Sequence, residues 1–422
     1  MKKPALVILF LWSLSHYSSA QDSSQVVSHN KHLKVFLNCG FCYQPYLKTQ
    51  ITWADFVQDQ FVADVDLLVA TIRTGSGGSN YALQFTGQNH FKGMNDTLTF
   101  TTNAINTDAE IRDLLAQKVK LGLVRYAAKI DVGDDLIINS ANVHDIEDVG
   151  IGSNPDDDPY NAWVFRINGN TNINAQKVFQ SGDFYGNVSA AQVKENFKLN
   201  LNLGTNYSEQ RFEFDGVKES YVLRSQFGTL NYVHSVSERW SAGVFTNFNM
   251  SDFSNYDYYQ NTALAVEYDF FPYKEAQTKL ITLAYNIGGV YFNFKDTTIF
   301  NETKTLVPTH SLNLGASFTQ TWGSLEAGSF AATFLSDFNK YRYGAWMSAD
   351  VRLFKGLSVS GYFSYNVIRD QINIRKGGAS EQEVLLQQQE LQTNYNFYTY
   401  FGISYRFGSI YNNVVNPRFN YG

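Results

Sequence analysis

The sequence predicts a transmembrane antiparallel β-barrel of about twelve strands, preceded by a small periplasmic α/β domain. Three observations lead to this prediction: an export signal at the start, a composition with 16% aromatic and only 17% charged residues, and long stretches of alternating apolar and polar residues after residue 161. Ordinary globular chains are about 25% charged. Long two-residue alternation is typical of a wall that faces lipid on one side and a polar lumen on the other.

The first twenty residues have the three parts of a secretory signal peptide. Lys2 and Lys3 are basic, residues 5–14 are apolar, and residues 18–20 form a small-residue cleavage site. The apolar segment is too short to cross a bilayer as a helix, so an uncleaved anchor is the weaker alternative. We predict a signal peptide over residues 1–20 and a flexible leader over 21–32, which places the mature protein outside the cytoplasm.

Residues 33–129 indicate the periplasmic α/β domain. Strands are predicted at 33–38, 51–57, 64–74, 79–88 and 96–102. A helix is predicted over 107–129, with Thr107 as its N-cap and Glu110 closing a capping box. Its apolar stripe comprises Ile111, Leu115, Val119 and Leu123. We expect this helix to pack on a mostly antiparallel sheet.

Two motifs in this half are typical of loops. The Gly-rich stretch at 74–78, TGSGG, lacks the Lys-Ser/Thr of a phosphate-binding loop and leads from strand to strand, so a hairpin turn is favoured. The predicted linker, residues 130–161, contains the run Asp156, Asp157 and Asp158. A solvated turn is the ordinary interpretation of this run, and a calcium site is a weak alternative. No other metal site and no cofactor are predicted.

The β-barrel is predicted over residues 162–408. Residues 197–207 read FKLNLNLGTNY, in which Phe197, Leu199 and Leu201 alternate with polar residues. Short connections are expected at 194–195, 237–238, 272–277, 323 and 355–356, and long ones at 214–219, 251–257, 295–308, 336–342 and 374–394. An even number of strands with alternating short and long connections is the pattern of outer-membrane barrels. A soluble β-sandwich, the alternative, would have shorter strands.

If the amino-terminal domain is periplasmic, every short connection falls on the periplasmic side. A periplasmic tail is predicted over residues 409–422. Alternation then predicts which charged side chains face the lumen: Lys198, Arg224, Glu267, Asp269, Asp350, Arg352 and Arg406. These charges could form ion pairs that plug the lumen, or they could line a pore for small polar solutes. The sequence leaves open whether the lumen is open and whether the 374–394 loop folds inward.

No catalytic constellation is predicted. His234 and His310 each precede a Ser on a predicted strand, and neighbours on a strand point to opposite faces, so neither pair forms a nucleophile and its base. His144 lies in the linker, and no G-x-S-x-G occurs. We therefore predict that the protein is not an enzyme and keep an outer-membrane hydrolase as the least favoured alternative.

Cys39 and Cys42 are the only cysteines and form a C-x-x-C after the first predicted strand. The periplasm is oxidising, which favours a disulfide between them. A thioredoxin-like redox site is less favoured because the facing cis-proline loop is missing. A zinc site is least favoured because no second ligand pair follows.

Several stretches together resemble a known group of proteins. They are CGFC (39–42), RTGSGGSNYALQFTGQ (73–88), GLVRYAAK (122–129), DPYNAWVFRI (158–167), VEYDFFPY (266–273) and FGSIYNNVVNPRF (407–419). With these the chain resembles an uncharacterised family of Bacteroidota-type, Gram-negative outer-membrane β-barrel proteins with a CxxC-containing periplasmic domain. The resemblance implies a cell outer membrane location and no particular activity. The domain also resembles, at the level of fold, the first domain of the Tol-system propeller protein.

The favoured function is a pore or binding protein for small polar solutes with an accessory periplasmic domain. The alternative is an envelope scaffold whose periplasmic domain holds another envelope protein. The expected partners are outer-membrane lipid and, through the domain, that second envelope protein. The mild net charge of −6 gives no indication of nucleic-acid binding.

Overall fold

The structure is a computed structural model that describes residues 32–39, 42–75, 77–137, 160–214, 216–354, 356–408 and 418. The predicted signal peptide, residues 21–31 of the predicted leader, His144, and the calcium candidates Asp156, Asp157 and Asp158 lie outside the described residues. The predicted tail, apart from Arg418, lies outside them as well.

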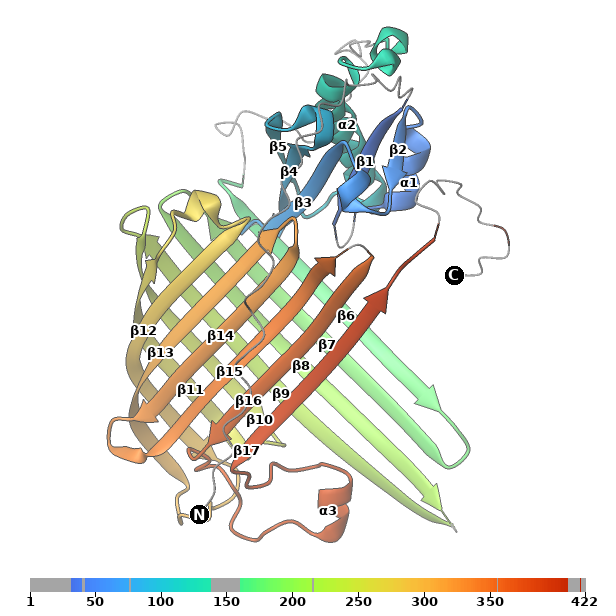
Figure 1. Ribbon diagram of the computed structural model, residues 1–422. Helices are drawn as coiled ribbons and strands as arrows, with labels where there is room; N and C mark the ends of the chain where they lie inside the picture. Colours follow the sequence, from blue (N-terminus) through green and yellow to red (C-terminus); the bar gives the residue numbers. More distant parts are fainter. Residues whose placement is uncertain are drawn as a thin grey trace, which may run out of the picture.

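The chain forms a small α/β domain that sits at one end of a large curved sheet (Figure 1). The domain contains five strands in the order β2-β1-β3-β4-β5. They are β1 (Leu33–Asn38), β2 (Ala54–Val57), β3 (Val65–Arg73), β4 (Ser79–Gly87) and β5 (Asn95–Thr102). The helices are α1 (Gln44–Gln50) and α2 (Asp108–Ala127), with short 3-10 helices η1 (Gln60–Val62), η2 (Asn89–Phe91) and η3 (Asp131–Asp135).

The sheet of this domain is mixed, not mostly antiparallel as expected. β1 runs parallel to both β2 and β3, whereas β3, β4 and β5 form an antiparallel meander. The parallel pairing of β1 and β2 requires a crossover, and α1 supplies it. This helix of seven residues was missed because it is too short to show a helical period, and its Pro45 resembles a turn signal.

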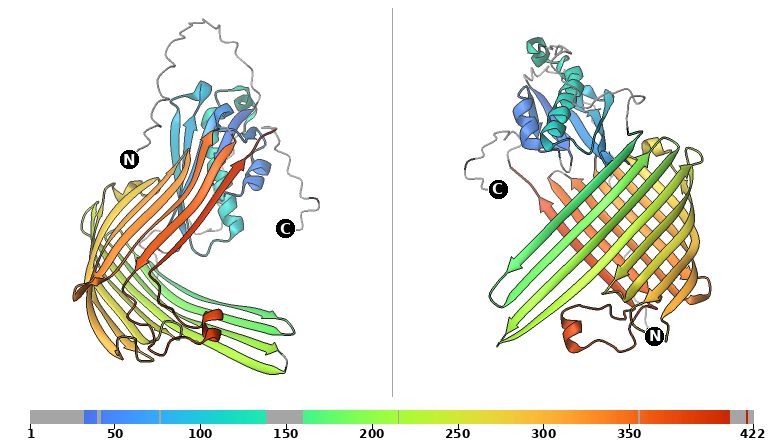
Figure 2. Two further views of the ribbon diagram at one scale, coloured as in Figure 1. Left: turned by 60° about the horizontal axis from the view of Figure 1, so that its bottom comes forward. Right: turned by 180° about the vertical axis from the view of Figure 1, so that it is seen from behind.

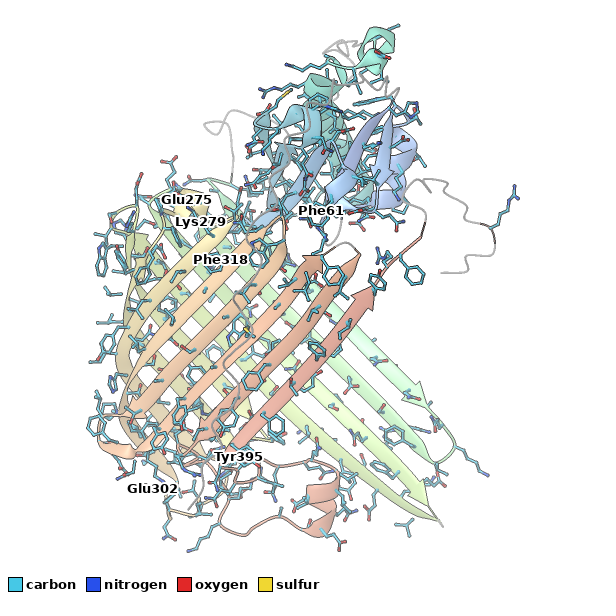
Figure 3. All side chains as sticks on the ribbon, in the orientation of Figure 1. Phe61, Glu275, Lys279, Glu302, Phe318 and Tyr395 are labelled. Atoms are coloured by element: carbon cyan, nitrogen blue, oxygen red, sulfur yellow. A yellow bond between two sulfur atoms is a disulfide. The ribbon has the colours of Figure 1, made fainter. Side chains whose placement is uncertain are left out.

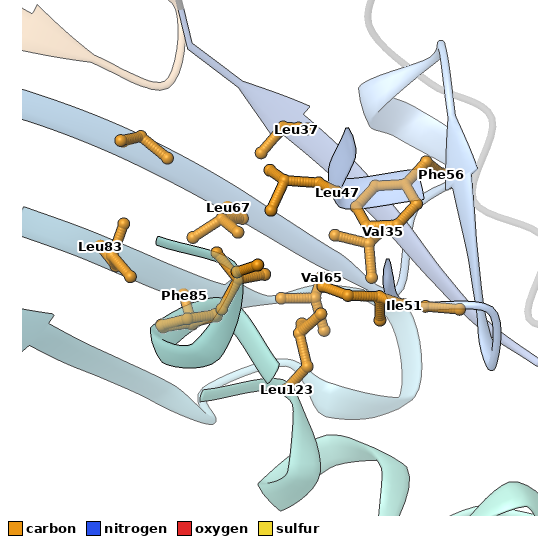
Figure 4. Close-up of a cluster of buried hydrophobic side chains, with 14 of the residues drawn as sticks. Val35, Leu37, Leu47, Ile51, Phe56, Val65, Leu67, Leu83, Phe85 and Leu123 are labelled. Carbon is orange, nitrogen blue, oxygen red and sulfur yellow. The ribbon is translucent and has the colours of Figure 1, made fainter. Parts of the chain in front are cut away.

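The helices cover one face of the sheet and enclose the hydrophobic core (Figure 4). On α2 the predicted side chains Leu115, Val119 and Leu123 are fully buried, and the capping box of Thr107 and Glu110 is present. A Cβ at Gly122 would overlap the Phe85 ring, so this glycine lets the helix approach the sheet closely. The predicted helix is therefore confirmed, and its position is fixed by the core.

The larger body, called here the barrel sheet, consists of twelve strands in sequence order, each antiparallel to the next. They are β6 (Trp163–Ala175), β7 (Phe179–Val193), β8 (Phe197–Phe214), β9 (Val217–Ser235), β10 (Trp240–Ser251), β11 (Tyr256–Asp269), β12 (Lys279–Phe294), β13 (Lys304–Gln320), β14 (Gly323–Phe334), β15 (Asp337–Phe354), β16 (Leu357–Ile368) and β17 (Tyr395–Tyr405). The predicted fold class is confirmed: an antiparallel transmembrane-type barrel sheet of twelve strands follows a small α/β domain. No helix among the described residues is long and apolar enough to span a bilayer.

The barrel sheet is curved but not closed (Figure 2). β6 and β17 form its two edges and, in the described part of the chain, are not paired with each other. The strands are strongly tilted, and Figure 2 shows the far ends of β6 to β9 reaching beyond their neighbours. The end that carries the domain is called the domain end, and the opposite one the far end.

The connections confirm only part of the expected alternation in length. Those at the domain end are 194–196, 236–239, 270–278 with η5 (Tyr273–Glu275), 321–322 and 355–356. At the far end, 295–303 and 369–394 with α3 (Glu381–Leu385) are long, but the expected loops 214–219 and 336–342 reduce to the two-residue turns 215–216 and 335–336. The ends of β8 and β9 carry charges, including the ion pair of Lys218 and Glu213 at 3.4 Å, and so resemble a loop in the sequence.

Candidate functional site at the two ends of the barrel sheet

The two faces of the barrel sheet differ in chemistry. Outward-facing side chains such as Ile167 (81% exposed), Phe401 (67%) and Leu264 (60%) are large and apolar. Inward-facing positions carry many amides and hydroxyls, and three of them form a ladder across β6, β7 and β8. Asn168 Nδ2 donates to Asn187 Oδ1 at 2.8 Å, and Asn187 Nδ2 donates to Asn202 Oδ1 at 2.6 Å. Figure 3 shows the side chains of the wall, with Glu275 and Lys279 at the domain end and Glu302 and Tyr395 at the far end.

Most of the predicted lumen charges share the inner face. The register places Lys198, Glu267, Asp269, Asp350 and Arg352 there, all toward the domain end. Arg406 follows the last paired residue of β17, and its backbone N–H donates to the Gly356 carbonyl at 2.7 Å. A group of charges of both signs therefore lies near the domain.

Arg224 was predicted to face the lumen, and this prediction is wrong. Arg224 is paired with Tyr207, and the outward-facing Leu203 and Leu201 lie four and six pairs further along β8 and β9, on the same face. Its guanidinium carbon lies 5.9 Å from the centre of the Tyr207 ring. Arg224 lies toward the far end of β9. The ends of a membrane strand extend beyond the apolar zone, so both faces of the strand can carry polar residues there.

Several inward-facing charged residues were missed, among them Arg166 on β6, Asp183 on β7, Glu219 on β9, Glu326 on β14 and Arg342 on β15. The alternation would have found Arg166 and Glu326, since each follows the period of its strand. Arg342 was assigned to a loop, because the polar stretch around residues 336–342 hid the start of β15.

Arg352 links the barrel sheet to the domain. Its guanidinium carbon lies 4.4 Å from the centre of the Phe36 ring. Its Nη1 donates to Gln60 Oε1 at 3.1 Å and to the Thr321 carbonyl at 3.3 Å. Asn38 of the domain donates to the same Thr321 carbonyl at 2.9 Å. Phe36, Asn38 and Gln60 belong to β1 and η1, so this contact holds these two elements of the domain against the barrel end.

Asp66 on β3 lies behind this contact. It is 1% exposed, and its Oδ2 accepts a hydrogen bond from Gln60 Nε2 at 2.8 Å, while its Oδ1 has no partner among the described residues. Burial raises the pKa of Asp66 to about 7, against the opposing effects of Arg352 and Gln60. A buried carboxyl that changes charge near neutral pH therefore lies at the junction of the two bodies.

The Gly-rich stretch forms the turn between β3 and β4, as predicted, and makes a second contact with the barrel sheet. The Thr74 N–H donates to the Gly78 carbonyl at 3.0 Å and closes the turn. A Cβ at Gly75 would overlap the Val193 side chain of β7, and one at Gly77, whose φ is +84°, would overlap the Arg166 guanidinium of β6. Together with Arg352 on β15, these contacts place the domain across the domain end from β6 to β15.

The far end is covered by the loop 369–394, here called the lid. Asn255 Nδ2 donates to the Asn373 carbonyl at 2.9 Å, and Asn373 Nδ2 donates to the Ser254 carbonyl at 3.0 Å. The Ile299 N–H donates to the Ile374 carbonyl at 2.9 Å, which ties the lid to the loop 295–303. Gln382 of α3 is hydrogen-bonded to Glu219 on β9. The lid thus spans from β16 and β17 to β9, and the loop that the sequence left unassigned folds over the sheet.

A cavity of about 650 Å³, here called the lumenal cavity, lies beneath the lid. Arg342 and Asp370 form an ion pair beside it, with Arg342 Nε 3.0 and 3.1 Å from the two carboxylate oxygens. Its lining combines aromatic rings with amides, hydroxyls and ionisable groups: Phe245, Tyr256, Tyr259, Phe292, Phe334, Asn249, Asn261, Asn286, Asn313, Asn373, Ser254, Ser311, Thr309, His310, Arg342, Asp370 and Glu390. Such a lining suits a ligand with both polar and apolar surface.

The remaining candidates from the sequence play structural roles or lie on the outer face, although His310 also borders the lumenal cavity. Cys39 and Cys42 form a disulfide, with Cα atoms 6.0 Å apart, as favoured. The register places His234 and His310 on the outer face. His310 Nδ1 is 3.2 Å from the Tyr285 hydroxyl.

Comparison with known proteins gives structural likeness only. No family model and no curated protein matches the chain. One similar solved structure is a NanC porin, 7% identical, covering 58% of this chain and 99% of its own with a TM-score of 0.27. Another is the translocator domain of the autotransporter NalP from Neisseria meningitidis, 12% identical, covering 70% of this chain and 98% of its own with a TM-score of 0.26.

Proposed function

We propose that the protein is an outer-membrane β-barrel that binds small polar solutes and lets them pass, with the amino-terminal domain covering its periplasmic mouth. The observation that carries this proposal is the contrast between the two faces of the barrel sheet. Twelve long strands present apolar side chains outward and a lining of amides, hydroxyls and charges inward. Such a wall is stable where lipid surrounds it and water fills it.

A bilayer also requires closure of the wall. The outer edges of β6 and β17 carry backbone groups that are unpaired among the described residues. Hydrocarbon offers these groups no hydrogen-bond partner, and each unsatisfied group costs several kcal/mol there. We therefore expect β6 and β17 to pair with each other in the membrane.

Both ends of the lumen are covered by segments of the same chain. The domain is fastened by Arg352 at one end, and the lid is fastened by Asn255, Asn373 and the ion pair of Arg342 with Asp370 at the other. Passage of a solute therefore requires both covers to move. This favours a gated pore with a low resting conductance.

Conductance in planar bilayers tests this proposal. The samples are the full-length protein, Arg352→Ala to loosen the domain, Arg342→Ala to loosen the lid, and the double variant. Each variant removes a charged group that holds a cover, so we expect low conductance for the wild type and the highest conductance for the double variant. Arg239→Ala is the matched control, because Arg239 lies at the domain end and contacts Tyr268 of the barrel sheet.

Two results would contradict the proposal. If no sample conducts, although heat-modifiable gel mobility shows folded barrels, the protein is not a pore. If Arg239→Ala opens the pore as strongly as Arg352→Ala, the conductance reports general damage at that end and not release of the domain.

A further inference from the structure

We propose that the lumenal cavity is a binding site for a short neutral saccharide. This inference rests on the proposed function, since it names the class of solute that the lumen would select. It is argued from the lining of the cavity: a patch of aromatic rings, amides and hydroxyls beside it, and no unpaired Lys or Arg side chain among its described residues to hold an anion.

The aromatic side is a continuous patch of rings from β11 and β12. The ring centres of Tyr256 and Tyr259 are 5.1 Å apart, and those of Tyr259 and Phe292 are 5.3 Å apart. Val290, Phe292 and Phe294 pack beneath them as a buried cluster, which holds the patch in place. A sugar ring has faces of C–H groups, and these can cover an aromatic patch and remove apolar surface from water on both sides.

The polar side supplies donors and acceptors at short intervals. Asn286 Nδ2 and Asn313 Nδ2 both donate to the Ser311 hydroxyl, at 3.1 and 3.2 Å. The Asn261 Oδ1 atom is buried and has no hydrogen-bond partner among the described residues. A buried acceptor without a partner is costly, and a ligand hydroxyl could donate to it. Amides suit hydroxyl groups well because each amide both donates and accepts.

The charges of the cavity exclude an anion. In the part of the chain that the structure describes, Arg342 is the one Lys or Arg side chain in the lining, and it is committed to Asp370 through both carboxylate oxygens, while the register turns the ring of His310 toward the outer face. Glu390 accepts hydrogen bonds from Gln371 Nε2 and Asn373 Nδ2, each at 2.8 Å, and leaves the cavity with a net negative charge. A phosphate or carboxylate ligand would be repelled, whereas a neutral polyhydroxyl ligand would not.

The size of the cavity agrees with a short saccharide. Its volume of about 650 Å³ falls within the roughly 300–1,000 Å³ of small-molecule sites. A single sugar ring would leave much of the aromatic patch uncovered, whereas a saccharide of a few rings would use both sides of the cavity.

Binding of saccharides to the purified full-length protein tests the proposal. The protein is kept in an amine-oxide detergent, because maltoside and glucoside detergents carry sugars of their own. A glycan array with neutral, acidic and amino-sugar members selects the probe, and isothermal titration with the best neutral member measures its affinity. We expect binding of neutral members, and Tyr259→Leu should weaken it about tenfold by removing a ring.

Variants on the same strands separate the site from the fold. Tyr259→Phe keeps the ring and should retain the affinity within about threefold. Asn261→Leu removes the acceptor for a ligand hydroxyl and should lower the affinity about tenfold. Leu264→Ala, on the outer face of β11, is the control and should leave binding unchanged. Binding only to acidic glycans, binding only to a polyamine such as spermidine, or no binding at all would overturn the proposal.

Conductance of the same sample distinguishes the two proposals. A protein that conducts but binds no neutral saccharide would refute the ligand class and leave the pore intact. A protein that binds the saccharide but never conducts would refute the pore and leave the binding site.

Discussion

Neutralising Asp66 by the substitution Asp66→Asn is expected to abolish a pH-dependent loss of stability in the amino-terminal domain. Asp66 is buried, with one carboxylate oxygen bonded to Gln60 and the other without a partner among the described residues. Burial raises its pKa from the ordinary value of 3.8 to about 7, although Arg352 and Gln60 oppose the shift. Asparagine keeps an acceptor for Gln60 and removes the charge.

The size of the effect follows from this shift. A rise of about three pKa units corresponds to about 4 kcal/mol. Because the folded pKa is raised, the folded domain holds more protons than the unfolded chain between about pH 4 and pH 7. The contribution of Asp66 to stability is therefore fully present below about pH 4 and is lost as the pH rises through about 7. Between pH 5 and pH 8 about 3 kcal/mol of this stability is lost. In a urea titration this corresponds to a fall of about 1.5 M in the midpoint.

Pulse proteolysis of the full-length protein in detergent measures this midpoint for the domain. Samples are equilibrated in urea at several values between pH 5 and pH 8, moved to one common buffer for a brief protease pulse, and scored for the intact domain. We expect the midpoint of the wild type to fall with rising pH and that of Asp66→Asn to stay constant. Asp96→Asn is the matched control, since Asp96 is a surface carboxylate of the same domain that pairs with Arg125 at 3.1 Å.

The reasoning would be refuted by equal pH slopes for Asp66→Asn and the wild type. In that case Asp66 is ionised throughout the range or is not buried in solution. A reduced slope for Asp96→Asn would show that the pH dependence arises from surface charge and not from the junction with the barrel sheet.

Three further predictions concern the β3–β4 turn, the disulfide of the domain and the closure of the barrel sheet. Gly75→Leu should force the β3–β4 turn away from Val193 and expose the domain to crosslinkers at the barrel end; unchanged crosslinking would contradict the close approach. Replacing both Cys39 and Cys42 by Ala should lower the urea stability of the domain by about 2 kcal/mol, as expected for so short a disulfide loop, without changing conductance. Cysteine pairs at inward-facing positions of β6 and β17 should form disulfides within one chain in the membrane, and links only between two chains would show that the sheet is closed by a second copy.

The wall of the barrel sheet could be predicted because its rule is local. Each residue between Phe197 and Tyr207 is apolar or polar according to which solvent it meets, and the strands are long enough for the period to be clear. The rule fails where the solvent is the same on both faces. Arg224 and Arg342 lie toward the far end, and there the alternation no longer tells inside from outside.

The domain shows a second limit. Helix α2 was predictable because it carries its own signals, a capping box and a full apolar stripe. The helix α1 and the parallel pairing of β1 with β2 and β3 carry no such signals, since they depend on which strands meet in space. The direction of pairing follows from the crossover and not from the composition of any strand.

The contacts that fasten the domain and the lid to the barrel sheet could not be predicted from the sequence, for the same reason. Asn38 and Thr321 are 283 residues apart, and Asn255 and Asn373 are 118 residues apart. Each is an ordinary polar residue whose importance comes only from its partner. The sequence predicted polar side chains in these loops but gave no reason to join them.

The topology of the domain explains both the C-x-x-C at 39–42 and the Gly-rich stretch at 74–78, the two motifs that suggest chemistry in the sequence. β1 and β3 are parallel neighbours, so their carboxyl ends lie at the same edge of the sheet. The disulfide of Cys39 follows β1 directly after Asn38, and the Gly-rich turn follows β3. That edge meets the barrel sheet, through Asn38 on one strand and Gly75 on the other. The disulfide fixes the turn after β1, and the glycines allow the turn after β3 to approach Val193 closely. The residue types that resemble a redox site and a phosphate loop are thus those that a domain needs to fit closely across the end of a barrel.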